Sequence, residues 1–394
     1  MTFQLNRHVA AVSEPPTGET ARWIKEGLAN PDLPLIDAAQ AVPNYPPAEV
    51  LREHLAEVVR QAESAFYTPI LGLPKLRDAL ALDLAKGYDA PIGEESVAIT
   101  CGGNHAFCMA ILALASPGDE VILPEPFYFN HEMWFDMQGI GVRRLACRER
   151  GEGMVPEPAD AAALITERTR AIVLISPNNP TGTIYEPARL KAFYDLARQH
   201  DLALVVDETY KDFLPGDGPA HSLFAEPDWG DVFVQLYSFS KVYSLTGYRT
   251  GSIAAGPRFI QAVAKIADTL NICAPRVGQE AALFGLTELG DWREHKRQDL
   301  LARIKLLDRA VAKHKPAFQM VSRGAFFAYL RHPLGGQASI EVSRRLLMEQ
   351  SVLTWPGSFF GRDQDPYIRL AFANAKPTEI DETIARLARF GDPA

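Results

Sequence analysis

Between residues 97 and 255, short apolar runs alternate with segments of helical periodicity, and this alternation restricts the fold more than any other feature of the chain. Apolar runs without strict polar alternation are typical of parallel strands that are buried on both faces. We therefore predict an α/β domain with a mainly parallel central sheet flanked by helices. The expected strands are 97–99, 120–123, 171–175, 202–206 and 232–236, and the expected helices between them include 105–115 and 187–200.

The rest of the chain suggests three predicted parts. Residues 1–46 are rich in proline and polar residues, and we expect an extended arm that also contributes to a small domain. Residues 47–288 form the predicted large domain, and residues 289–394 form a smaller α+β domain. Helices are expected at 48–61, 74–84, 257–270, 291–313, 339–350 and 377–390, and short strands near 326–330, 352–354 and 368–371.

Composition disfavours several classes of protein. A net charge of −9, without a basic patch, argues against nucleic acid as a partner. The four cysteines lack metal-ligand spacing and nearby histidine pairs, so we expect neither a metal site nor a disulfide framework. No run of about 18 apolar residues occurs, so we expect no membrane contact and a cytoplasmic location.

Polar residues gather directly after four of the expected strands. They lie at 100–104, 176–182, 207–210 and 238–241. Because open α/β sheets bind ligands at the carboxyl ends of their strands, we expect these segments to meet in one site.

Lys241 is the main candidate for chemistry. An amine condenses with an aldehyde only when it is neutral, so it needs a partly desolvated setting with other cations nearby. Arg249, Ser238 and Ser240 offer such a setting together with donors for a phosphate group. The pattern indicates a site for a phosphate-bearing aldehyde, and a surface lysine beside a Ser/Gly turn is the alternative.

Asp207 ends the apolar run 202–206, which puts its carboxylate at the carboxyl edge of a buried strand. A carboxylate there needs a cationic partner, and a pyridinium nitrogen would serve. The alternative is that Asp207 caps the next helix. Asn179 lies in a run of turn-forming residues aimed at the same edge. Gly103 and Asn104 open a helix whose free N–H groups suit a phosphate.

In this order, the pieces resemble the pyridoxal-phosphate aminotransferases of the aspartate aminotransferase family (class I/II, fold type I). The match runs from about residue 35 to residue 373, and its motifs are specific when taken together. They are Tyr67-Thr68-Pro69, Gly72-Leu73-Pro74, Gly102-Gly103, Pro124-Glu125-Pro126-Phe127-Tyr128, Asn179-Pro180-Thr181-Gly182, Asp207-Glu208-Thr209-Tyr210, Ser238-Phe239-Ser240-Lys241, Arg249, Pro356-Gly357 and Arg369-Leu370-Ala371-Phe372.

The resemblance implies that Lys241 forms the internal aldimine with pyridoxal 5'-phosphate and later moves the proton between the substrate α-carbon and the cofactor. It implies that Asp207 pairs with the pyridine nitrogen, and that Asn179 and Tyr210 donate to the phenolic oxygen. The residues expected at the phosphate are Ser238, Ser240, Arg249 and the backbone amides of Gly103 and Asn104.

Tyr128 matches the aromatic residue that stacks on the cofactor ring. In a slightly different register Phe127 or Phe129 would take that place, and Tyr128 would be a core aromatic. Similarly, His131 resembles a histidine that lies behind the aspartate, with a partly exposed helix histidine as the alternative.

Two further matches concern the partner subunit and the substrate. Tyr67 matches a tyrosine that reaches the phosphate of the neighbouring subunit, which implies a homodimer with shared active sites. Arg369 matches the arginine that binds the substrate α-carboxylate with Asn179 nearby, and a structural salt bridge is its alternative. Ala41 stands where the family often has glycine, so we expect its methyl group to narrow the substrate pocket.

The implied reaction is a transamination, in which an amino group moves between an L-amino acid and a 2-oxo acid through a pyridoxamine phosphate intermediate. A pyridoxal-phosphate-dependent carbon–sulfur β-lyase would use nearly the same residues and stays open as the alternative. A non-catalytic protein on this scaffold is disfavoured because Lys241 is present.

Overall fold

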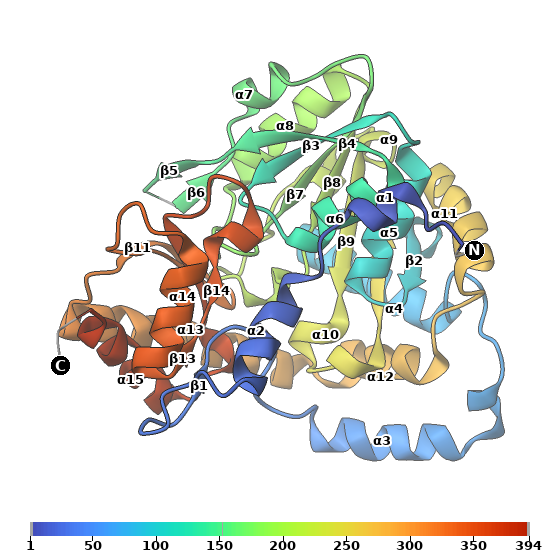
Figure 1. The fold of residues 1–394 in the computed structure, drawn as a ribbon. Coiled ribbons are helices and arrows are strands. Elements are labelled where there is room, and N and C mark those ends of the chain that lie inside the picture. The colour runs from blue at the N-terminus through green and yellow to red at the C-terminus, as the bar shows by residue number, and fades with distance from the viewer. Residues whose placement is uncertain (1–2, 152, 392–394) are drawn as a thin grey trace.

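The computed structural model describes residues 3–151 and 153–391, and a seven-stranded sheet forms its centre (Figure 1). The strand order is β2-β10-β9-β8-β7-β3-β4. All neighbours are parallel except β10, which is antiparallel to both β2 and β9. The prediction of a mainly parallel sheet is confirmed. The strands are β2 (Val97–Thr100), β3 (Glu120–Glu125), β4 (Gly141–Ala146), β7 (Thr169–Ile175), β8 (Ala203–Asp207), β9 (Phe233–Ser238) and β10 (Gly251–Ala254).

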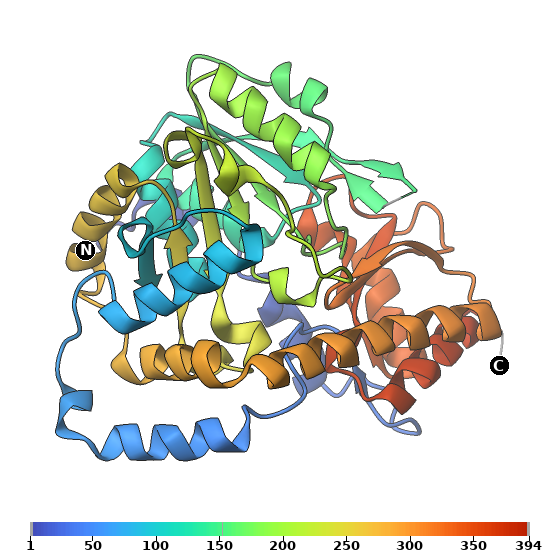
Figure 2. The ribbon, with the colours of Figure 1, turned by 180° about the vertical axis from the view of Figure 1, so that it is seen from behind.

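Alternate residues of the central strands enter two different hydrophobic cores, which is why these strands read as continuous apolar runs. Ile172 and Leu174 of β7 face one core, whereas Ala171 and Val173 face the other. Figure 1 shows α5 and α6 on one side of the sheet, and Figure 2 shows α4 and α12 on the other. The covering helices are α4 (Pro74–Tyr88), α5 (Gly103–Leu114), α6 (Phe129–Gln138), α8 (Pro187–Gln199), α11 (Pro257–Leu270) and α12 (Arg276–Glu288).

Helix α13 (Gly290–His314) leads from the large sheet to a second, antiparallel sheet with the strand order β11-β12-β15-β14. The short strand β1 (Ile36–Asp37) pairs with β13 (Val352–Leu353), so the N-terminal segment joins this smaller unit. The boundaries 1–46, 47–288 and 289–394 remain predictions. The elements of this unit are β11 (Gln319–Gly324), β12 (Phe327–Arg331), α14 (Ser339–Gln350), β14 (Trp355–Pro356), β15 (Tyr367–Ala371) and α15 (Pro377–Arg389).

The expectation of an extended arm over residues 1–46 is wrong in part, because the arm contains helices α1 (Arg7–Ala11) and α2 (Pro16–Lys25). Proline is tolerated in the first turn of a helix, and Pro16 starts α2 instead of interrupting it. The helix buries Trp23 against the smaller unit.

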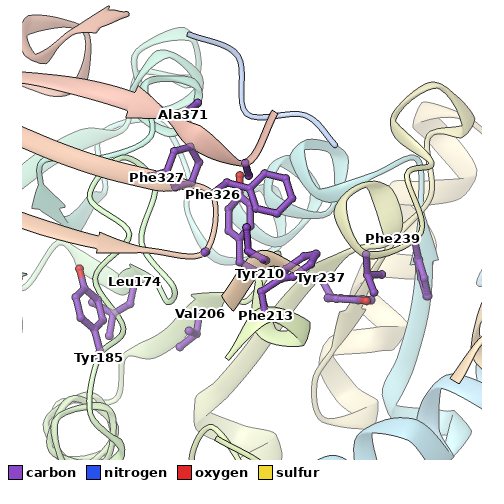
Figure 3. Close-up of a cluster of buried hydrophobic side chains, with 14 of the residues drawn as sticks. Leu174, Tyr185, Val206, Tyr210, Phe213, Tyr237, Phe239, Phe326, Phe327 and Ala371 are labelled. Carbon is purple, nitrogen blue, oxygen red and sulfur yellow. The ribbon is translucent and has the colours of Figure 1, made fainter. Parts of the chain in front are cut away.

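An aromatic contact joins the two units beside the carboxyl edge of the large sheet (Figure 3). The rings of Tyr210 and Phe213, which follow β8, pack on Phe326 from the turn between β11 and β12, with centroid distances of 5.4 and 5.1 Å. The ring centroid of Phe327, the next residue, lies 5.3 Å from that of Tyr210. Within the described residues, no helix is both long and apolar enough to cross a bilayer.

Candidate active site

A cavity of about 310 Å³ is lined by residues from the large sheet, the small sheet and the N-terminal segment. The polar segments that follow β7, β8 and β9 all contribute to it, as the sequence predicts. The predicted site residues that line it are Ala41, Gly103, Asn104, Tyr128, Asn179, Asp207, Tyr210, Ser238, Ser240, Lys241, Arg249 and Arg369.

The Lys241 amine lies in this cavity and donates a hydrogen bond of 2.6 Å to the backbone oxygen of Ala41. Burial, followed by the positive charges of Arg369 and Arg249, lowers the pKa of Lys241 to about 8, while Asp207 acts in the opposite direction. At pH 7.5 about a quarter of such an amine is neutral. A nucleophilic amine is therefore available near neutral pH.

Glycines allow the backbone to approach Arg249 closely at one end of the cavity. A Cβ atom at Gly102, where φ is +93°, would lie 2.5 Å from an Arg249 side-chain nitrogen. A Cβ atom at Gly251 would lie 2.8 Å from the backbone nitrogen of Gly103. Only glycine leaves this space free, which keeps the first N–H groups of α5 and the guanidinium together.

Two serines complete this end of the cavity. Ser238 ends β9, and its hydroxyl oxygen accepts a hydrogen bond of 3.3 Å from the backbone N–H of Ser240 as the short helix α10 (Phe239–Val242) begins. Asn104, in the first turn of α5, lines the same cavity. Hydroxyls, backbone N–H groups and one guanidinium make a suitable cup for a phosphate.

The Asp207 carboxylate lies at the end of β8 with its two oxygens in different settings. One accepts a hydrogen bond of 2.9 Å from the Thr209 backbone, and the other lies 3.8 Å from Nε2 of His131. Burial raises the pKa of Asp207. His131 is buried against the Phe107 ring, and burial lowers its pKa to about 3. The alternative of a partly exposed histidine is therefore wrong, and a neutral imidazole lies beside the Asp207 carboxylate.

Tyr128 lines the cavity just before α6, and its hydroxyl accepts a hydrogen bond of 2.7 Å from the Asn130 side chain. Burial raises its pKa. Phe127 and Phe129 are buried in two different hydrophobic cores and are not among the residues that line the cavity. The geometry thus favours Tyr128 over its neighbours as the aromatic wall.

Tyr210 forms another part of the wall, and its ring centroid lies 6.0 Å from the Lys241 amine. Burial raises the pKa of Tyr210, so its hydroxyl stays protonated near neutral pH and can donate a hydrogen bond.

Arg369 brings a buried guanidinium from β15 to the opposite side of the cavity. It donates a hydrogen bond of 2.9 Å to the Asn179 side-chain oxygen and another to the Ala39 carbonyl, and its Cζ atom lies 4.0 Å from the Trp355 ring centroid. Burial lowers its pKa to about 9.

Among the described residues, no ion pair between Arg369 and a carboxylate is found, so its structural alternative, a salt bridge, is absent there. The Nε atom is buried and has no hydrogen-bond partner within that part of the chain. A buried cation in this state is suited to an anion from outside the chain.

Sequence reasoning missed several residues that line the cavity. Two of them lie beside motifs and could have been included: Thr209 is inside the segment 207–210, and Trp355 precedes Pro356-Gly357. The others, from weakly patterned loops and a strand end, are Gln40, Val42, Ile175 and Thr246.

Tyr67 is the one predicted site residue that does not line this cavity. Its side chain lies on the surface, with 75% of its area exposed. In addition, no cluster of three or more potential metal ligands occurs in the part of the chain that the structure describes.

Comparisons with known proteins agree with this geometry. The family model for aminotransferase class I and II matches residues 32–387. An aspartate aminotransferase of Sulfurisphaera tokodaii is 28% identical over 388 residues, covering 94% of this chain and 90% of that protein. The aromatic aminotransferase ISS1 of Arabidopsis thaliana is 28% identical over 374 residues, covering 93% and 91%. The structure of Thermus thermophilus aspartate aminotransferase with maleate is similar, with a TM-score of 0.88 and 26% identity over 98% of this chain and 100% of that one.

Proposed function

The chain belongs to the class I and II aminotransferases, and we propose that it transfers an amino group between an L-amino acid and a 2-oxo acid with pyridoxal 5'-phosphate held at Lys241. The carbon–sulfur lyase alternative is not favoured, because the relatives named above are aminotransferases. A homodimer with shared sites and a cytoplasmic location are further parts of this proposal.

The residues of the cavity fit the proposed cofactor at both of its ends. The phosphate would be held by Arg249, Ser238, Ser240 and the first N–H groups of α5, where glycine leaves room for an anion. One Asp207 oxygen is held by the Thr209 backbone N–H and the other lies beside the neutral imidazole of His131, so the carboxylate can accept a hydrogen bond from a protonated ring nitrogen.

When bound, pyridoxal phosphate supplies an aldehyde for the amine and a ring that withdraws electrons from the substrate. Asp207 would keep the proton on the ring nitrogen. Arg369 would bind the substrate α-carboxylate with its guanidinium and orient the α-carbon toward the lysine. As general base, Lys241 would then take the proton from the substrate α-carbon, and as general acid it would deliver a proton to the cofactor.

The homodimer proposal is supported by an exposed apolar surface around Tyr67. Phe66 and Tyr67 lie on one loop, whereas Leu270 ends helix α11 and Ile272 follows it, and all four have large exposed areas. Exposed apolar groups of this kind commonly mark subunit contacts. A second copy that covers this surface would bring Tyr67 to the phosphate end of the neighbouring cavity, where Arg249 is also exposed.

The observation that carries the proposal is the meeting of Lys241, Asp207 and Arg369 in one cavity. The test is a panel of L-amino acids added to the pyridoxal-phosphate-loaded protein, with and without 2-oxoglutarate or pyruvate. Addition of the amino acid alone is expected to shift the visible absorbance once, without turnover, and the 2-oxo acid is expected to reverse it. Continuous release of pyruvate and ammonia without an acceptor would favour the lyase instead.

A further inference from the structure

Gln279 is fully buried on α12, and all of its side-chain hydrogen bonds end on two loops. Its amide nitrogen donates to the hydroxyl oxygen of Thr68 and to the backbone oxygen of Ala274, each at 2.8 Å. Its amide oxygen accepts from the backbone N–H of Leu73 at 2.7 Å. One side chain thus holds both ends of the loop 68–73 and ties that loop to the segment before α12.

Tyr67 directly precedes the loop 68–73, and this loop has little room to move. At Gly72, where φ is +103°, a Cβ atom would lie 2.4 Å from the Ile99 side chain and 3.0 Å from the Gln279 amide oxygen. The Leu71 carbonyl accepts a hydrogen bond of 2.9 Å from the backbone of Ile99. The loop is packed against strand β2 on one side and fixed by Gln279 on the other.

The residue before Gln279 lies against the phosphate end of the chain's own cavity. A Cβ atom at Gly278 would lie 2.4 Å from the Thr250 hydroxyl and 2.5 Å from the Tyr248 carbonyl, the two residues that flank Arg249. The first turns of α12 therefore contact two elements at once: the loop that carries Arg249 and the loop that carries Tyr67.

We propose that Gln279 is a positioning residue for the active site of the partner subunit, which it serves by fixing the loop that presents Tyr67. This inference rests on the proposed homodimer and cofactor. A buried amide needs all of its hydrogen bonds satisfied. Here the hydrogen bonds of Gln279 fix the loop 68–73 in one conformation. The exposed Tyr67 side chain then keeps a defined position even though it does not line the cavity of its own subunit.

The first experiment measures cofactor occupancy by borohydride trapping on Lys241 at increasing concentrations of pyridoxal phosphate. Gln279→Met keeps the length of the side chain and removes every hydrogen bond, and Tyr67→Phe removes only the hydroxyl. Each variant is expected to raise the half-saturating concentration about tenfold, because a hydrogen bond to a charged group is lost or misplaced. The half-saturating concentration of the double variant is expected to lie within about twofold of that of the single variant that binds the cofactor less tightly. Two changes in one chain of contacts are not additive.

The second experiment separates an effect on the partner's site from an effect on the protein's own site. Mixed dimers carry Lys241→Ala on one subunit and Gln279→Met on the other, with two different tags used for purification. The one lysine that can be trapped then receives Tyr67 from a subunit with an intact Gln279. Trapping at that lysine is expected to return to within about twofold of the wild-type affinity, and mixed dimers of Lys241→Ala with Tyr67→Phe are expected to do the same.

A matched control is Gln235→Met, because Gln235 is also a buried glutamine but bonds to Tyr88 and Glu208 within the large domain. Any defect that it causes is expected to persist in the mixed dimer. Persistence of the Gln279→Met defect there would overturn the inference, as would wild-type affinity of the Gln279→Met homodimer. A Tyr67→Phe variant without effect would instead overturn the shared active site itself.

A milder variant covers the case in which Gln279→Met does not fold. Thr68→Val removes one partner of the amide and keeps the shape of the side chain. It is expected to weaken trapping about threefold, to be restored in the mixed dimer, and to leave the melting temperature nearly unchanged. Unaltered trapping by folded Thr68→Val, when Gln279→Met is unfolded, counts against the inference.

Discussion

Arg369 of the small sheet donates a hydrogen bond of 2.9 Å to Asn179, which lies 190 positions earlier in the chain, after strand β7. This contact crosses the cavity between the two units and holds the guanidinium in place. It joins one residue expected to bind the substrate to one expected to bind both substrate and cofactor, so the two units have to be correctly placed for either to act.

Substitution of Arg369 by alanine is expected to raise the KM for the amino acid about a hundredfold, because the α-carboxylate loses its buried cation. Initial rates over a range of donor concentrations measure it. Arg331→Ala on the neighbouring strand β12 is the control, since that side chain bonds to Glu149 and Tyr367 instead. An unchanged KM in Arg369→Ala would exclude the assigned role.

Substitution of Lys241 by alanine is expected to lower kcat by at least about a thousandfold while pyridoxal phosphate is still retained through the phosphate cup. Steady-state turnover assays measure the first effect, and the absorbance of the bound cofactor after gel filtration measures the second. Lys265→Ala, an exposed lysine on α11, is the control. Transamination that continues in Lys241→Ala would refute the assignment of the nucleophile.

The rate of cofactor capture is expected to rise with pH and to level off above about pH 8. Burial and two neighbouring cations lower the pKa of Lys241 to about 8, and only the neutral amine attacks an aldehyde, so the reactive fraction falls about tenfold for each unit of pH well below that value. Stopped-flow absorbance on the cofactor-free protein measures it. A midpoint near 10 would mean that the amine is not desolvated.

Substitution of Asp207 by asparagine is expected to lower kcat by about a hundredfold or more, because the neutral amide cannot hold a protonated ring nitrogen. The bound cofactor is expected to absorb at an altered wavelength. Asp195→Asn, at a half-buried position of α8 where the carboxylate pairs with Lys191, is the control. Full activity of Asp207→Asn would leave the ring nitrogen without its proposed partner.

Substitution of Phe326 by alanine is expected to lower the free energy of unfolding by about 3 kcal/mol, because the ring is buried between Tyr210 and Phe213. Urea denaturation followed by circular dichroism measures it. Phe326→Leu is the matched variant and is expected to cost less than about 1.5 kcal/mol. If Phe326→Ala unfolds with the same free energy as Phe326→Leu, the aromatic contact between the units contributes little to stability.

The sequence predicts the sheet well where strands are buried on both faces, as in the run 171–175 that becomes part of β7. It does not predict β4, an edge strand whose Arg143 and Arg144 interrupt the apolar pattern, or β10, which is short and contains Gly251. Both are held by tertiary pairing, which local pattern does not report.

The candidate site follows a similar division. Residues inside compact motifs, such as Asp207 and Lys241, can be identified because strand ends and turns place them. Gln40 and Val42 cannot be placed so easily, because their presence in the cavity depends on how the N-terminal segment folds back onto the rest of the chain.

The backbone oxygens of Ala39 and Ala41 accept hydrogen bonds from the two cavity cations that we propose to act on the substrate, Arg369 and Lys241. Every amino acid has a backbone carbonyl, so the residue types at positions 39 and 41 do not reveal these two hydrogen bonds. Variants at positions 39 and 41 are therefore expected to change the side chains near the cavity without removing the hydrogen bonds to either cation. The condition is that the backbone keeps its path.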